Sequence, residues 1–279
     1  MSLTLILLLV VLGLITGFYS GFIGTGGNII LIPALDLLFI YFDVAPHDSV
    51  KLIIAHSLFI TVFLGLSVSY KQFKVGNFYL KEVLFIGVPG MFTAFFLTEI
   101  LKRSDWYDKT YFDIIFLFLL VLLACRMLFF HPKAHSVEHE QENPAKKPLL
   151  MGIGLFTGGV TSLSGLGGGI VLIPFLSDVL KKEITKASSI SIGVIALLSF
   201  SVSISYLFVN DPGSTPSVLP YQTGYISIPL VIPVLIGLFF STSFGVKAAH
   251  KARPKTLRIT FGIIILILIT KMVYSIFFS

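Results

Sequence analysis

The sequence predicts an all-α polytopic membrane protein with about ten hydrophobic segments, arranged in two inverted-topology repeats with glycine-rich broken or re-entrant helices. Three observations carry this prediction: the composition, an internal duplication and the distribution of Lys and Arg. Of the 279 residues, 55% are hydrophobic, 12% are charged and 27 are Phe, which is far from the composition of soluble domains. Runs such as 112–130 and 259–270 are apolar on all sides, as lipid requires.

Ten apolar segments follow one another, at residues 3–21, 28–42, 51–70, 80–101, 110–130, 149–163, 169–180, 187–209, 224–246 and 257–278. We expect six or seven of them to span, because a spanning helix needs about 20 residues. The segments 149–163 and 169–180 are short, so they form either tilted spans or a hairpin that turns mid-membrane. The hydrophilic stretch 131–148 predicts a cytoplasmic linker between a first transmembrane repeat, 1–130, and a second, 149–279.

The second half of the chain can be laid on the first at an offset of 141 residues. Twelve of 23 positions are then identical, which exceeds what shared hydrophobicity would produce and indicates an internal duplication. The matching residues are Gly13, Leu14, Thr16, Gly17, Gly24, Gly26, Gly27, Ile29, Leu31, Ile32, Pro33 and Leu35, and their partners are Gly154, Leu155, Thr157, Gly158, Gly165, Gly167, Gly168, Ile170, Leu172, Ile173, Pro174 and Leu176.

The positions of Lys and Arg predict the topology, because positive residues are retained on the cytoplasmic side. Fifteen of the 20 lie in four loops, 71–81, 126–148, 178–186 and 247–258. Loops 43–50 and 210–221 then face outside, as does loop 102–109 in spite of its three basic residues. Both termini are expected outside, and the two repeats are expected to have opposite orientations.

An inverted repeat with discontinuous helices is typical of a secondary transporter, which binds its substrate near the bilayer midplane. Glycines permit positive φ angles, so successive N–H groups can form an anion-binding nest. If helices restart at Asn28 and Gly169, their N-terminal ends add partial positive charge. The alternative is that these glycines only permit close helix packing. The candidate substrate-binding residues are Gly24, Thr25, Gly26, Gly27, Asn28, His56, Ser57, Ser162, Ser164, Gly165, Gly167, Gly168, Gly169 and Ser191.

Several polar residues within the apolar segments need separate interpretations. His56, with Ser57 beside it, is a candidate for substrate binding or proton handling, and the alternative is a histidine bonded to a neighbouring helix. Ser191 lies in the corresponding stretch of the second half, although membrane serines often bond only their own backbone. Lys271 and Arg126 lie near helix ends and are expected to anchor the chain at the interface.

The paired stretches GFYSGFIGTGGNIILIPAL (17–35) and GGVTSLSGLGGGIVLIPFL (158–176) resemble the repeated glycine-rich signature of the sulfite exporter TauE/SafE family of membrane permeases. The resemblance implies transport, typically outward, of sulfite, sulfoacetate or another organosulfonate across the bacterial inner (plasma) membrane. The first copy departs from the signature, with Thr25 and Asn28 where a hydrophobic residue and a third glycine are expected.

Other function classes fit the sequence poorly. The linker contains an H-x-x-E-H pattern at His135, Glu138 and His139, but it lies in a proline-bounded stretch without an obvious third ligand, so we expect no enzyme, metal or cofactor. The glycine runs lack the Lys that follows them in nucleotide-binding loops. Topology accounts for the net charge of +6, so we expect no nucleic-acid partner.

The partners predicted by sequence are the lipid bilayer and a small anion. The sequence leaves open whether protons or sodium are coupled, whether subunits pair as a homodimer, and whether the protein is instead an anion channel or a non-transporting scaffold or sensor.

Overall fold

The computed structural model describes residues 2–23, 26–104, 106–129, 146–209, 219, 221–251, 262–263 and 265–273. Its helices are α1 (Leu3–Ile23), α2 (Asn28–Tyr41), α3 (Pro46–Lys74), α4 (Leu80–Lys102), α5 (Lys109–Phe129), α6 (Lys146–Ser164), α7 (Gly169–Pro174), the π-helical η1 (Phe175–Val179), α8 (Ile184–Leu207) and α9 (Ile228–Lys251). Residues 265–273 are also helical. Each predicted apolar segment overlaps a helix, so the all-α polytopic fold is confirmed. A small departure is the hairpin of β1 (Gln222–Thr223) and β2 (Ile226–Ser227), which precedes α9.

Helix length and surface chemistry both fit a bilayer. Among the described residues, five helices are long and apolar enough to cross it: α1, α3, α4, α8 and α9. Large apolar side chains are exposed along the outer helices, for example Leu7 on α1, Phe92 on α4, Phe118 on α5 and Phe240 on α9. So much exposed apolar surface is unusual in water and is expected against lipid tails.

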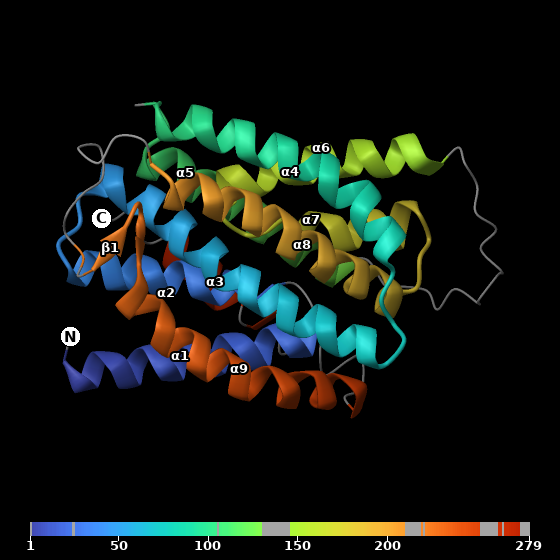
Figure 1. Ribbon diagram of the computed structural model, residues 1–279, viewed down its shortest axis with the longest axis horizontal. Helices are drawn as coiled ribbons and strands as arrows, with labels where there is room; N and C mark the ends of the chain where they lie inside the picture. The colour runs from blue at the N-terminus through green and yellow to red at the C-terminus, as the bar shows by residue number, and fades with distance from the viewer. Residues whose placement is uncertain are drawn as a thin grey trace.

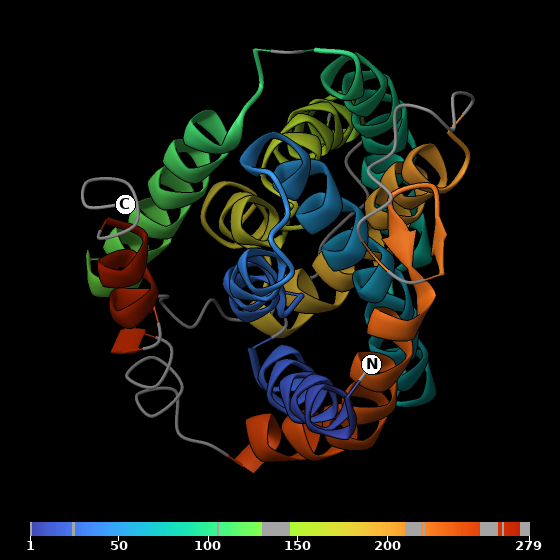
Figure 2. The same ribbon diagram turned by 90° about the vertical axis from the view of Figure 1, so that its left-hand side faces the viewer.

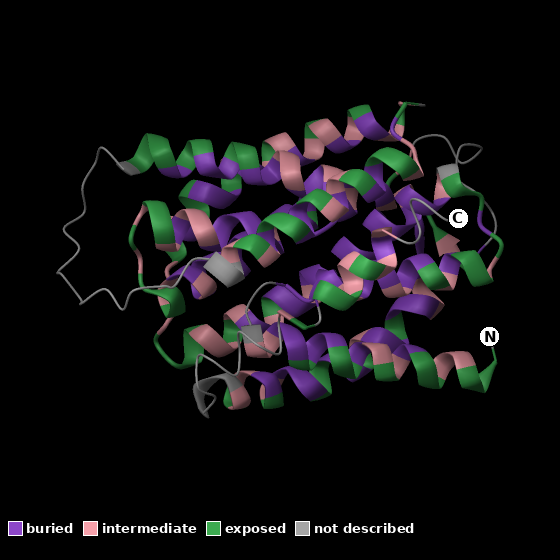
Figure 3. Cartoon of the chain, turned by 180° about the vertical axis from the view of Figure 1, so that it is seen from behind, coloured by how far each residue is buried: buried purple, intermediate pink, exposed green. Residues whose placement is uncertain are grey.

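Helices α3 and α8 form the centre of the bundle and pack against each other. In their apolar stretches 78% of the residues are buried, compared with 33% in α1 and α4. Viewed from one end, the other long helices surround this centre (Figure 2), and the buried residues gather on the inner helices (Figure 3).

The outer helices pair across the two halves of the chain. Helix α1 packs along α9, and α6 packs along α4. Glycines allow both approaches: a Cβ at Gly13 would lie 2.1 Å from the carbonyl oxygen of Val234, and one at Gly154 would lie 2.1 Å from that of Ile86. Close packing is therefore the role of these glycines, and it joins the first helix of each half to the fourth helix of the other.

Each half also contains a helical hairpin. Figure 1 shows α2 running back toward the end of the bundle at which α1 begins, and α7 with η1 running back toward the end at which α6 begins. Gly26 and Gly27 in the first turn and residues 165–168 in the second are buried. The short segments α2 and α7 with η1 therefore fold back on the helices that precede them.

Candidate functional site at two glycine breaks

The glycines that directly precede α2 and α7 have the same left-handed backbone conformation in both turns. Positive φ angles occur at Gly26 (97°) and Gly27 (71°) in the first turn, and at Gly165 (68°), Gly167 (72°) and Gly168 (76°) in the second. Only glycine adopts this region without a steric penalty. We call these turns the first and second glycine breaks. The helices restart at Asn28 and Gly169, as the sequence predicted.

Both breaks contain backbone N–H groups for which the described residues provide no backbone acceptor. Within the part of the chain that the structure describes, no hydrogen bond starts from the N–H groups of Gly167, Gly168, Gly169 or Ile170, or from those of Gly26, Gly27, Asn28 and Ile29. All eight residues are buried. Unpaired buried N–H groups are rare, and a helix N-terminus carries partial positive charge. The breaks therefore provide donors for a negatively charged group.

Neighbouring helices press closely on both breaks in equivalent ways. A Cβ at Gly27 would lie 2.8 Å from Thr16 Cγ2, and a Cβ at Gly168 would lie 2.2 Å from Thr157 Cγ2. Thr16 and Thr157 correspond at the offset of 141 residues. Glycine is thus required at each helix start both for its backbone angle and for the space that a side chain would need.

Asn28 joins the two breaks. Its side-chain Nδ2 donates to the carbonyl oxygen of Gly165 over 2.8 Å, and its Oδ1 lies 2.5 Å from the hydroxyl of Thr61 on α3. The Ser57 hydroxyl lies 3.4 Å from the same Gly165 oxygen. The structure thus brings together Asn28, Ser57 and Gly165, three of the candidate residues that the sequence predicted. However, the Asn28 amide already has protein partners, so it holds the site together more directly than it could contact a ligand.

Several buried hydroxyls near the centre of the bundle lack a partner. Among the described residues, no hydrogen bond reaches the hydroxyls of Ser20, Ser191, Ser199 or Ser203. Ser199 Oγ would lie 3.6 Å from a Cβ built at Gly167, which places it beside the second break. The sequence analysis named Ser191 but missed Ser20 and Ser199. A signal was available in the spacing of four between Ser199 and Ser203, which aligns them along one side of α8.

Two other predicted donors are used within their own helix or by its neighbour. Ser162 Oγ lies 2.8 Å from the Ala94 oxygen of α4, and Ser164 Oγ donates to Val160. Gly24 and Thr25 lie outside the described residues. Thus the structure places Ser162 at the α6–α4 contact and Ser164 at the end of α6, where it also accepts a bond from the N–H of Leu166.

His56 is buried at the centre of α3 with both ring nitrogens bonded. Nδ1 lies 2.7 Å from the Leu52 carbonyl oxygen, and the backbone N–H of Ser227 lies 2.9 Å from Nε2. A carbonyl can only accept and an N–H can only donate, so the ring is a neutral tautomer with its proton on Nδ1. This arrangement favours the bonded-histidine interpretation, because α3 is thereby attached to the start of α9.

Lys271 and Arg126, which the sequence predicted as interfacial anchors, each form an ion pair with the helical hairpin of the other half. Lys271 Nζ lies 3.6 Å from Asp36 Oδ2 on α2. Arg126 Nε lies 3.0 Å from Asp178 Oδ2 at the end of η1. In each case the last helix of one half contacts the helical hairpin of the other. The sequence analysis also missed Asp36, although an acid within an apolar helix is itself a signal.

Apolar helices around a buried, polar pair of helix breaks indicate an integral membrane protein. The chain belongs to the sulfite exporter TauE/SafE family, whose family model matches residues 9–272. A probable membrane transporter protein of Methanocaldococcus jannaschii is 31% identical over 257 residues, which cover 92% of this chain and 91% of that protein.

Two further relatives are also described as probable membrane transporter proteins. One, from Haemophilus influenzae, is 25% identical and covers 96% of this chain and 98% of its own length. The other, YunE of Bacillus subtilis, is 23% identical with 98% of each chain covered. No solved structure was found to match the chain. Family and relatives together indicate a membrane transporter rather than an enzyme.

Proposed function

We propose that the protein is a secondary transporter that exports a small sulfur-containing anion, such as sulfite, sulfoacetate or another organosulfonate, across the bacterial inner membrane. The observation that carries the proposal is the pair of buried glycine breaks, whose N–H groups have no backbone acceptor among the described residues. The family name supports the choice of anion.

The chemistry of the second break suits such an anion. The oxygens of sulfite and sulfonates accept hydrogen bonds, and the N–H groups of Gly167 to Ile170 form a nest of donors. The Ser199 hydroxyl is a further donor beside them. Neither break contains Lys or Arg. Neutral dipoles bind an anion without holding it as a salt bridge would, which allows release on the other side.

Alternating access is supported by the way in which the halves interlock. We propose that residues 1–130 and 149–279 are inverted repeats joined by the cytoplasmic linker 131–148, with both termini outside. The exchanged pairs α1 with α9 and α6 with α4 are the contacts expected from two repeats related by pseudo-two-fold symmetry. One repeat can then rock against the other around the anion between the breaks.

Cysteine labelling tests the proposed sidedness. Ala45, between α2 and α3, and Val75, between α3 and α4, are exposed and lie at opposite ends of the bundle (Figure 1). In a Cys125→Ser background, Ala45→Cys should react with an impermeant thiol reagent from outside and Val75→Cys from the cytoplasm. Labelling of both from one side would contradict the topology.

Transport itself is tested with the purified protein in liposomes. We expect saturable counterflow of radiolabelled sulfite, with sulfate, thiosulfate, taurine and sulfoacetate as competitors. Flux that never saturates would indicate a channel, and anion-dependent thermal stabilisation without flux would indicate a sensor.

A matched pair of variants locates the transport site. Gly26→Asn should abolish counterflow, because it places a side chain in the first glycine break. The variant should still fold, because Asn tolerates a left-handed backbone and the nearest side-chain atom is 3.6 Å from the new Cβ. Gly76→Asn is the control, because its φ is 73° and no atom lies within 4 Å. Normal counterflow in both variants would place the site elsewhere.

A further inference from the structure

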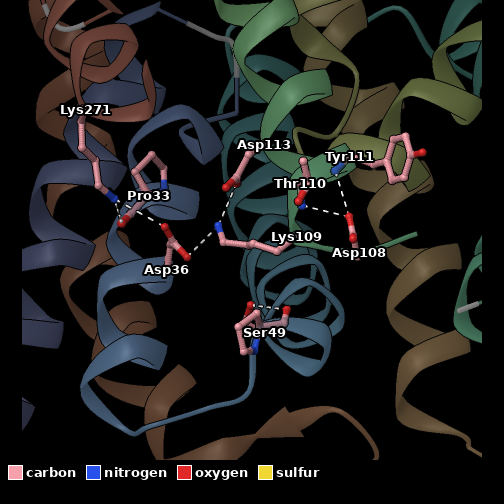
Figure 4. A network of polar contacts seen from close by, with 10 residues as sticks. Pro33, Asp36, Ser49, Asp108, Lys109, Thr110, Tyr111, Asp113 and Lys271 are labelled. Atoms are coloured by element: carbon pink, nitrogen blue, oxygen red, sulfur yellow. Dashed lines mark hydrogen bonds and ion pairs between the residues drawn. The ribbon is translucent and has the colours of Figure 1, made fainter. Parts of the chain in front are cut away.

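Four charged residues form a cluster that joins α2, α5 and the helical segment 265–273. Lys109 Nζ lies 2.9 Å from Asp36 Oδ1 and 2.8 Å from Asp113 Oδ1. Lys271 Nζ lies 3.6 Å from Asp36 Oδ2 and donates to the carbonyl oxygen of Pro33. Figure 4 shows the two carboxylates converging on Lys109 from different helices. We call Asp36, Lys109, Asp113 and Lys271 the acid–base cluster.

The acids of the cluster are more deeply buried than its bases. The side chains of Asp36 and Asp113 are 6% and 7% exposed, compared with 21% and 29% for Lys109 and Lys271. Two buried carboxylates that share one ammonium repel each other, and water screens them little. Such an arrangement favours uptake of a proton by one of them.

The contacts within the acid–base cluster indicate which groups could take up that proton. Lys109 donates to Asp113 Oδ1, and its Nζ also lies 2.9 Å from Asp36 Oδ1, a buried oxygen that accepts no hydrogen bond of regular geometry from the residues that the structure describes. Of the other titratable groups nearby, Tyr107 faces Asp113, and burial followed by the Asp113 charge raises the pKa of its phenol, so it stays neutral. His56 of α3 has both nitrogens bonded. The carboxylates are thus the groups suited to exchange a proton.

Asp36 is mechanically connected to the first glycine break. It follows Asn28 by eight residues on α2, which at the helical rise corresponds to about 12 Å. Protonation of Asp36 removes its attraction to Lys109 and Lys271, and so weakens the attachment of α2 to α5 and to the segment 265–273, while Lys271 still donates to the Pro33 carbonyl oxygen. Because Asp36 and Asn28 lie on one helix, we expect this change to reach the first glycine break.

We propose that the acid–base cluster binds the proton that is coupled to anion transport, an inference that rests on the proposed transport function. One carboxylate takes up one proton and becomes a carboxylic acid, while both lysines stay protonated. The formal charge of the cluster then changes from zero to +1. This charge offsets that of a monoanion bound at the breaks, so the two can cross the membrane together without net charge movement.

The test uses liposomes that contain a pH-sensitive dye. For the parent, Asp36→Asn and Asp113→Asn, we would measure sulfite counterflow, which needs no net proton movement, and the pH change that accompanies net sulfite flux. Both variants should retain counterflow. They should lose the accompanying pH change. They should also lose the dependence of sulfite accumulation on the pH difference across the membrane, which one coupled proton makes roughly tenfold per pH unit. The control is Asp178→Asn, because Asp178 pairs with Arg126 at a 40% exposed site, and it should behave as the parent.

A second measurement works without transport. Infrared difference spectra of the parent, recorded between an acidic and an alkaline pH, should show the band of a carboxyl group that loses its proton, and this band should be lost in Asp36→Asn or Asp113→Asn. If an Asn variant fails to fold, the double variant Asp36→Asn/Lys271→Met removes one charge of each sign and avoids an unpaired buried charge.

The possible results separate the two proposals. Absence of parental counterflow would contradict the transport function, and the infrared band would still decide whether the cluster binds a proton. Parental counterflow without proton movement, or a titrating band that persists in both variants, would overturn the proton proposal and leave the transport function intact.

Discussion

The two glycine breaks have the same backbone but different side chains. Gly27 and Gly168 both take left-handed conformations ahead of a helix, and a threonine from the preceding helix presses on each. The next residue is Asn28 in the first break and Gly169 in the second. The Asn28 side-chain amide donates a hydrogen bond to the Gly165 carbonyl oxygen in the other break, whereas Gly169 has no side chain with which to form such a bond. The comparison shows that glycine backbone geometry creates donors at both breaks, and that a single side chain makes the pair asymmetric.

The largest effect is expected from a side chain at the start of either helix. Gly168→Ala should lower the free energy of unfolding by about 2–5 kcal/mol, because it combines a left-handed backbone with a clash against Thr157. Gly27→Ala should lower it somewhat less, because its Cβ has more room. Gly76→Ala, with positive φ and no close neighbour, isolates the backbone part at about 1–2 kcal/mol. Equal losses in a detergent unfolding assay at all three positions would show that the helix contacts contribute nothing.

The Ser199 hydroxyl separates ligand binding from folding. Ser199→Ala should weaken anion binding about 10- to 150-fold, the value of roughly 1.5–3 kcal/mol for a hydrogen bond to a charged group. Because the hydroxyl has no partner among the described residues, stability should change by less than about 0.5 kcal/mol. Ser189→Ala is the control, because that hydroxyl donates to the Asn77 carbonyl oxygen; it should lose stability and keep affinity. Binding is read from anion-dependent thermal shifts, and unchanged affinity in Ser199→Ala would remove this hydroxyl from the site.

Removal of the link between the breaks should have an intermediate effect. Asn28→Gly makes the two breaks alike and leaves the buried Gly165 oxygen without its strongest donor, so unfolding should require about 1–2 kcal/mol less. The double variant Asn28→Gly/Thr61→Val should lose less stability than the sum of the losses in the two single variants, because both residues belong to one hydrogen-bond network. Strict additivity in the double-mutant cycle would show that the network does not act as a unit.

The smallest effect is expected at His56. Because its neutral ring is held by Leu52 and Ser227, His56→Gln should leave the pH profile of transport unchanged, with some loss of stability. Asp36→Asn provides the contrast in the same assay. A flattened profile in His56→Gln would restore His56 as the proton-handling residue that the sequence suggested.

The sequence by itself determined the apolar helices, the duplication and the places where the chain turns. Long apolar runs have few alternatives to helix in lipid, because every backbone polar group must be bonded within the protein. The runs of glycine then fixed the helix restarts at Asn28 and Gly169, since other residues rarely adopt positive φ. These constraints act within single segments, so they can be inferred from the amino-acid sequence alone.

Only the tertiary structure decided what the polar side chains do. Asn28 and His56 were correctly recognised as exceptional within apolar segments, but their partners, Gly165 and Ser227, lie more than 130 residues away in the chain. Lys271 similarly pairs with Asp36, which lies 235 positions earlier in the chain. A polar group inside a membrane must find its partner on another helix, and which helices come together is set by packing, such as the glycine contacts between α1 and α9, that no single segment specifies.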